Sequence, residues 1–299
     1  MNKVKYYCDL ITKSRGHGAM DNFQRKIRFV FRTIFCLPYS LKIINFVYNH
    51  KFLSEKVFDY PIILSKMFRP YLSNLFTTKE RYYYLIDNYK FIDKNFSQFI
   101  VEKLYKEGSI KLAEIIGKGD EKLEIFLSLY PKFDKEGDIE IKIVNSENIS
   151  LAKITFSFIK YEEKDTLFIG GIQGPKKDVD KDLIKRVTKI MYGAFPKRIL
   201  IEVLYGIIEN LNINIRKICV GNTTHMYLSK RYIKRKTINA DYDKFIESLN
   251  GKKLENALWE LPKELYRKEI EEVSSKKRSE YKKRYEIFNK LRADIAKVL

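Results

Sequence analysis

The sequence predicts an α+β fold in which helices precede a mainly antiparallel sheet and a basic helix ends the chain. Apolar side chains recur at helical spacing over the first hundred residues, at every second position between Ser109 and Gln173, and again at helical spacing afterwards. The 299 residues, 45% of them hydrophobic, are enough for one large core or two smaller ones. We expect a helical region over 1–105 and an α+β core domain with its C-terminal helix over 106–299.

The N-terminal region is expected to consist of several helices. Leu53, Val57 and Tyr60 share one helical face. The prolines expected to mark helix boundaries are Pro38, Pro61 and Pro70. Charges and a proline interrupt the apolar stretch 29–47, which is too short for the ~20 apolar residues of a membrane span. Its aromatic and basic mixture suits a membrane surface, but a buried helix pair broken at Pro38 explains the same residues and is favoured.

The middle of the chain is expected to form an antiparallel meander of four or five strands, the last over Thr166–Ile172. The alternating apolar residues are Leu123, Ile125, Leu127 and Leu129, then Ile139, Ile141 and Ile143, then Ile154, Phe156 and Phe158. Gly137-Asp138 and 145–148 supply turn residues. A sharp break is expected over Gly170–Pro175, because glycines allow unusual backbone angles or the close approach of another group.

Two helices and a strand are expected after this break. Asp180 is placed to cap the first helix and Pro196 to open the second, and Ile215–Val220 has the composition of a strand. The last helix carries an apolar stripe of Tyr281, Tyr285, Phe288, Leu291 and Ile295, whose tyrosines are expected to point inward. Its other faces carry Lys276, Lys277, Arg278, Lys282, Lys283 and Arg284. These cations form either a solvated face or a site for an acidic partner.

The charge balance favours anionic partners. Lys and Arg number 58 against 38 Asp and Glu, which leaves a formal net charge of +20. Nucleic acid, anionic lipid, phosphorylated cofactors and acidic proteins such as acyl carrier protein all fit this charge. A second basic cluster consists of Lys230, Arg231, Lys234, Arg235 and Lys236. It carries no known nucleic-acid-binding signature, so it supports only sequence-independent binding.

Cysteine and histidine usage excludes several kinds of site. Three widely spaced cysteines indicate a reducing compartment, and Cys219 lies in an apolar run typical of a buried structural thiol. A Cys219 nucleophile served by His225 is the alternative. Neither His17 nor His50 has neighbours at metal-ligand spacing, so no metal is expected. The start of the chain lacks the pattern of a secretory signal, and we expect a cytoplasmic protein, with peripheral association at the inner membrane left open.

Several short motifs occur in the same order as in a known bacterial family. They are Arg69–Leu72 (RPYL), Ile169–Pro175 (IGGIQGP), Thr188-Lys189, Pro196-Lys197, Ala240–Phe245 (ADYDKF), Leu261-Pro262 and Lys276–Tyr281 (KKRSEY). Together they resemble the VirK/YbjX family from about Phe52 to the C-terminus. The resemblance implies a cytoplasmic protein linked to virulence, envelope properties and tolerance of antimicrobial peptides, built on a domain of unknown function.

The segment around the glycines is also similar, more loosely, to the acyl-CoA-binding core of the GCN5-related N-acetyltransferases. There a strand, a glycine-rich turn and a helix hold the donor pyrophosphate on backbone N–H groups. The resemblance implies donor contacts from Gln173 and Gly174, with positive charge from Lys176, Lys177, Lys197 and Arg198. A tight turn with solvated lysines is the alternative explanation.

The candidate catalytic residues follow the strand at 215–220. His225 is the candidate general base and Tyr227 the candidate acid toward a leaving thiolate. Asp241 and Asp243 either orient the base or cap a helix running to Leu249. Together these residues favour an acyltransferase that takes its acyl group from acyl-CoA or acyl carrier protein and transfers it to an envelope- or peptide-related acceptor. The alternative is a non-enzymatic factor that binds anionic lipid or nucleic acid through its basic C-terminal face.

Overall fold

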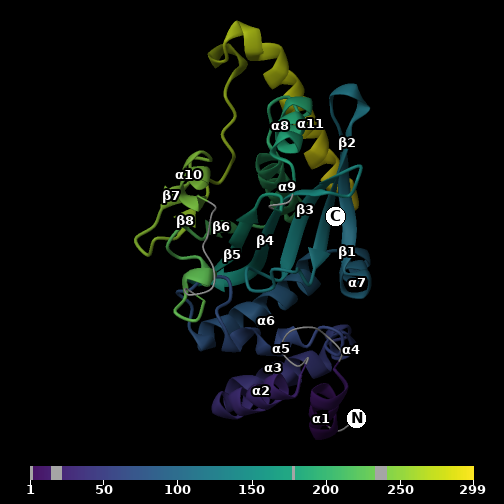
Figure 1. Ribbon diagram of the computed structural model, residues 1–299, viewed down its shortest axis with the longest axis vertical. Helices are drawn as coiled ribbons and strands as arrows, with labels where there is room; N and C mark the ends of the chain where they lie inside the picture. The colour runs from purple at the N-terminus through teal and green to yellow at the C-terminus, as the bar shows by residue number, and fades with distance from the viewer. Residues whose placement is uncertain (1–2, 15–21, 177–178, 233–240) are drawn as a thin grey trace.

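The structure, a computed structural model, describes residues 3–14, 22–176, 179–232 and 241–299. Helices of the N-terminal region lie at one end of the molecule, the sheet occupies its middle, and the last helix reaches the opposite end (Figure 1). The N-terminal helices are α1 (Lys3–Lys13), α2 (Phe23–Phe35), α3 (Leu37–Asn49), α4 (Leu53–Lys56), α5 (Ile62–Ser65), α6 (Thr78–Asn95) and α7 (Gln98–Glu107). The expected helical region is therefore confirmed.

Local sequence explains where these helices begin and end. Pro38 lies in the first turn of α3, and Pro61 directly precedes α5. At the start of α6, Thr77 and Glu80 form a reciprocal capping box, which satisfies two backbone N–H groups. The chain leaves α7 through Gly108, whose φ of 80° is readily adopted only by glycine.

Within the described residues the sheet has eight strands in the order β1-β2-β3-β4-β5-β6-β8-β7. They are β1 (Ser109–Ile116), β2 (Lys122–Leu129), β3 (Ile139–Asn145), β4 (Ser150–Tyr161), β5 (Lys164–Gln173), β6 (Arg216–Cys219), β7 (Lys252–Lys253) and β8 (Trp259–Glu260). Strands β1 to β5 form the expected antiparallel meander. Strand β6 pairs parallel to β5, which makes the sheet mixed.

The connection between β5 and β6 contains α8 (Lys181–Ile190) and α9 (Pro196–Leu211), and α10 (Tyr242–Glu247) and α11 (Ser275–Val298) follow β6. As expected, the Asp180 carboxylate accepts the N–H of Asp182 at 2.9 Å, and Pro196 opens α9. Helix α9 packs on β3 and β4, and α11 packs on α9 and β1. Buried apolar side chains form one connected cluster from Tyr6 to Ile295. The domain division at residue 105 stays a prediction.

The expectation that residues 29–47 form a buried helix pair is wrong for α2. The chain does break beside Pro38, and α2 and α3 meet at a bend of 110°. Helix α3 buries Ile43, Ile44 and Val47, but α2 buries only Phe29 and Thr33. No single described helix is long and apolar enough to cross a membrane, although α2 and α3 together pass the length and composition test as a bent pair.

Two further expectations need correction. On α11 the apolar stripe is buried from Phe288 onward, whereas Tyr281 and Tyr285 are half-exposed because the first half of this helix extends beyond the sheet (Figure 1). The last strand of the meander was predicted to end at Ile172 and ends at Gln173, so Gly170 and Gly171 lie inside β5 and the chain breaks only after them. The two glycines allow another segment of the chain, around Glu136, to pack closely against β5.

Candidate functional site

A cavity of about 1210 Å³ lies beside the end of β5. Its walls come from Lys132 and Phe133, from the turn between β3 and β4, from residues 173–176 and from the start of α8. The basic lining residues are Lys132, Lys153, Lys176 and Arg186, and the acidic ones are Glu147, Asp180 and Asp182. Asp182 pairs with Lys185 at 2.8 Å, which offsets part of the negative charge. The cavity therefore offers a ligand both cationic and apolar contacts.

Gly174 lies at the edge of this cavity and close to the start of α9. A Cβ built on Gly174 would meet only the Lys197 Cε, at 3.8 Å, so the packing of the chain does not itself require glycine there. The N-cap residue of α9, Phe195, makes no side-chain capping hydrogen bond. Burial lowers the pKa of Lys197, whose Nζ lies 5.8 Å from the centre of the Phe245 ring. An anion placed here would compensate the half-buried ammonium.

Arg198, the neighbouring residue on α9, points elsewhere. Its guanidinium contacts Glu202 at 3.3 Å and the carbonyl oxygen of Tyr266 at 3.4 Å. Glu202 is fully buried and also accepts hydrogen bonds from Arg267 at 3.0 Å and Arg292 at 2.7 Å. Arg198 thus belongs to an ionic network that joins α9 to the C-terminal part of the chain. The structure does not bring it to the cavity.

A buried polar cluster under the cavity centres on Glu136, a residue that the sequence analysis did not single out. The Gln173 side-chain amide donates to both Glu136 carboxylate oxygens, at 2.9 and 2.8 Å. The His225 Nε2 lies 3.7 Å from Glu136 Oε1 and 3.3 Å from the Tyr242 hydroxyl. Because Gln173 also lines the cavity, it links this cluster to the candidate ligand site.

The two glycines of β5 make room for Glu136. A Cβ on Gly170 would lie 2.1 Å from the Glu136 carbonyl oxygen, and one on Gly171 would lie 1.9 Å from its Oε2. No side chain fits at these distances. The glycine pair therefore allows the 131–138 loop to pack over the strand, rather than allowing a phosphate to approach it.

The RPYL motif holds the same loop from the other side. Arg69 pairs with Asp134 at 2.5 Å, and the Leu72 N–H donates to the Lys135 carbonyl at 2.8 Å. The buried Tyr71 hydroxyl donates to Asp138, which also pairs with the buried Lys66. Two of the family-like motifs thus converge on one loop. The signal available in the sequence was a glutamate directly before the Gly137-Asp138 turn, between two apolar strands.

His225 is positioned by the turn that follows β6, and only 2% of its surface is exposed. Its Nδ1 accepts the Tyr227 N–H at 3.3 Å, which places the ring proton of the neutral form on Nε2. The Tyr242 hydroxyl opposite Nε2 accepts the N–H of Ile172 at 3.2 Å, so it ties the end of β5 to α10. His225 does not line the cavity, and its role as a base stays a prediction.

The other predicted catalytic residues surround this turn. Tyr227 packs on the His225 ring at 5.3 Å, and burial raises its pKa. Asp241 caps α10 by accepting the Lys244 N–H at 3.1 Å. Asp243 accepts the Trp259 indole N–H at 2.9 Å and the Asn222 N–H at 2.7 Å. Both aspartates therefore have structural partners, and neither lines the cavity.

The basic residues of α11 fall into two groups. Arg278 donates to the Val273 carbonyl at 3.0 Å, and Arg284 donates to the Tyr192 carbonyl at 2.7 Å, so both arginines stabilise the fold. The lysines of this set are all exposed, as is Arg278; they are Lys276, Lys277, Lys282 and Lys283. They lie at the far end of α11 from the sheet (Figure 1). In the second cluster, Lys230 is exposed, whereas Lys234, Arg235 and Lys236 lie outside the described residues.

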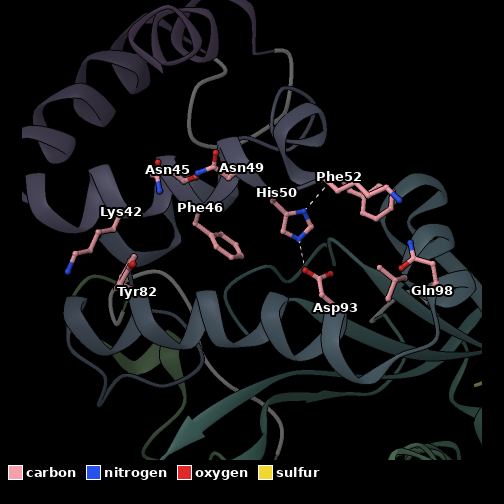
Figure 2. A pocket seen from close by; sticks show the side chains of 11 residues that line it. Lys42, Asn45, Phe46, Asn49, His50, Phe52, Tyr82, Asp93 and Gln98 are labelled. Atoms are coloured by element: carbon pink, nitrogen blue, oxygen red, sulfur yellow. Dashed lines mark hydrogen bonds and ion pairs between the residues drawn. The ribbon is translucent and has the colours of Figure 1, made fainter. Parts of the chain in front are cut away.

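A second cavity, of about 630 Å³, lies between α3 and α6. Figure 2 shows His50 in its wall, with dashed lines to Asp93 and to the start of the next helix. Its Nε2 is 2.8 Å from Asp93, and its Nδ1 accepts the N–H groups of Phe52 and Leu53 at 3.2 Å. Both ring nitrogens are engaged, so His50 joins the helices. His17 and Lys177 lie outside the described residues.

Metal and thiol chemistry find little support in this structure. Among the described residues no group of three His, Cys, Asp or Glu side chains is arranged to hold a metal ion. Cys219 is fully buried, and burial raises its thiol pKa, which disfavours the thiolate that a nucleophile requires.

The comparisons with known proteins agree with the family that the sequence motifs indicate. Residues 18–297 match the family described as "protein of unknown function (DUF535)". The chain belongs to this family. Over 275 residues it is 34% identical to the uncharacterized protein YbjX of Escherichia coli K12. The aligned region covers 90% of this chain and 82% of that protein. An uncharacterized Haemophilus influenzae protein is 28% identical to the chain over 220 residues. That aligned region covers 74% of this chain and 72% of the Haemophilus protein. No solved structure matches the chain.

Proposed function

We propose that this protein is an acyltransferase that binds the phosphorylated part of an acyl donor, acyl-CoA or acylated carrier protein, at the end of β5. One observation carries the proposal. Pairing between β5 and β6 ends at Ile169 and Cys219, while β5 continues through Gln173 to the edge of the cationic cavity. A parallel strand pair that parts beside the start of a helix is a common place for a phosphate to bind, and here residues 173–176 line the cavity at the end of β5.

The order of elements supports the same proposal. A strand, a crossover through α8 and α9, and a parallel strand are similar to the donor-binding core of the GCN5-related N-acetyltransferases. The half-buried Lys197 ammonium, whose pKa burial lowers, is suited to a phosphate group near Gly174. The exposed Lys176 adds charge at the mouth of the cavity.

The reaction in this proposal is direct acyl transfer. An amine or hydroxyl of the acceptor attacks the thioester carbonyl, the carbon–sulfur bond breaks, and the acceptor's proton ends on the departing thiol. No oxidant, metal or second cofactor is needed for this balance. His225 remains the proposed base; its Nε2, beside Glu136 and Tyr242, accepts a proton in the tautomer that carries the ring proton on Nδ1. The acceptor is proposed to be related to the envelope or to peptides.

Calorimetry with acyl-CoAs of several chain lengths and with an acylated carrier protein tests the donor site. We expect the wild-type protein to bind one donor class, and Gly174→Val and Lys197→Met to weaken that binding about tenfold or more. Both variants should stay folded, because Gly174 has open space beside it and Lys197→Met removes a poorly solvated charge.

The matched control is Lys94→Met, which removes an exposed lysine on α6 and should leave donor affinity unchanged. Absence of binding heat with every donor for the wild-type protein would contradict the acyltransferase proposal.

A further inference from the structure

Helix α2 turns most of its apolar side chains toward solvent. Phe31, Ile34 and Phe35 are 58%, 60% and 85% exposed. The apolar surface that we call the α2 stripe consists of Phe23, Ile27, Phe31, Ile34, Phe35, Leu37 and Leu41. Positions 23, 27, 31, 34 and 35 share one face of a helix, and the last two continue the surface around the corner onto α3. Single exposed apolar residues are common, but a continuous stripe indicates a binding surface.

The charges carried by α2 and α3 themselves have one sign. Between Asn22 and Ser54 the sequence contains no Asp or Glu. The basic residues of α2 and α3 are Arg25, Lys26, Arg28, Arg32 and Lys42. Arg28 and Lys42 are exposed beside the stripe. An apolar face with cations along its borders is the pattern of helices that lie in the headgroup region of anionic membranes.

The shape of this region fits a flat surface. Helices α2 and α3 meet at 110°, and the exposed Phe35 and Leu37 occupy the corner. In Figure 1, α1 and α2 lie at the end of the molecule opposite the start of α11. Between α1 and α2 there is an apolar depression of about 520 Å³ lined by Ile11, Phe23 and Val30 among others.

We propose that α2 and its corner with α3 dock this protein on an anionic membrane surface, with the α2 stripe inserted among the lipids and the neighbouring cations against the headgroups. The charge pattern favours a membrane over a second copy of the chain, because self-association would bring together two copies of α2 and α3, whose charges are all basic. This inference stands independently of the proposed acyl transfer.

Co-sedimentation with vesicles tests the docking surface. The full chain is mixed with vesicles of phosphatidylglycerol and phosphatidylcholine in equal parts, and with vesicles of phosphatidylcholine alone. We expect binding to the anionic vesicles, weaker binding to the neutral ones, and a decline as salt rises. The double variant F31S/F35S should bind at least about tenfold more weakly, since both phenyl groups leave the lipid.

The matched control is Phe99→Ser, which removes an exposed phenylalanine of α7 outside the stripe and should bind like wild type. A Phe35→Trp variant supplies a second readout: its emission should shift to the blue on anionic vesicles and be quenched by brominated lipid. Failure of the wild-type chain to bind anionic vesicles would overturn the proposal. So would equal binding by F31S/F35S, equal losses in F31S/F35S and Phe99→Ser, or a change of F31S/F35S from dimer to monomer with vesicle binding intact.

Discussion

Glu136 is a buried residue whose place at the centre of the polar cluster becomes visible only in the structure. It is 1% exposed, and its partners Gln173 and His225 lie far away in sequence. A buried carboxylate is costly unless other groups hydrogen-bond to it, and here the amide of Gln173 satisfies both oxygens. The sequence analysis identified Gln173 and His225 from local patterns. It missed Glu136 because a glutamate before a turn is a weak signal, and the contact with Gln173 forms only in the folded sheet.

His225 is the residue whose role most needs a direct measurement. Replacement by alanine would leave a hole between the rings of Tyr227 and Tyr242, so His225→Gln is the better variant. If His225 is the base, His225→Gln should lower acyl-transfer turnover about a hundredfold or more with little change in melting temperature. The measurement is turnover at saturating donor together with thermal unfolding. Unchanged turnover in the folded variant would assign His225 a structural role.

At the scale of elements, regular patterns were predictable and orientations were not. Alternation of apolar residues predicted the β1–β5 meander, and Asp180 and Pro196 predicted the starts of α8 and α9. The amphipathic pattern of α2 gave a helix, but periodicity cannot say which face meets the core when both faces carry aromatic residues. The same limit explains Tyr281 on α11, which continues the apolar stripe past the point where the sheet ends.

Strand β5 gives the sharpest element-level prediction. Gly171→Ala should lower the free energy of unfolding by about 1–3 kcal/mol, because its Cβ would overlap the Glu136 carboxylate that Gln173 holds in place. Gly174→Ala, three positions along the same strand end, is the control and should change stability by less than ~0.5 kcal/mol. Urea unfolding measures both. Equal stability of the two variants would show that the loop carrying Glu136 does not need the glycine.

Over the whole molecule, two of the basic helices lie at opposite ends. Helix α2 lies at one end of the long axis and the start of α11, with its exposed lysines, at the other (Figure 1). The net charge of +20 was visible in the sequence, but the distance between these two helices was not, since it depends on how α11 packs on α9 and β1. A single flat membrane contacts one end of such a molecule. The α2 end offers apolar side chains as well as charge, whereas the described α11 lysines offer charge alone.

The variant K282E/K283E separates the two ends. Each Lys→Glu substitution lowers the formal charge by two, so the formal net charge falls from +20 to +16. We expect its binding to anionic vesicles to stay within about twofold of wild type, because exposed charges act over only ~10 Å at 0.1 M salt and the α2 stripe is unchanged. Donor turnover should also be unaltered, since Lys282 and Lys283 do not line the cavity. The measurements are vesicle and single-stranded RNA binding across a salt series, with F31S/F35S in parallel. The opposite outcome would be loss of vesicle and RNA binding in K282E/K283E with normal binding by F31S/F35S. It would show that the C-terminal helix is the anion-binding surface and that α2 does not take part in binding.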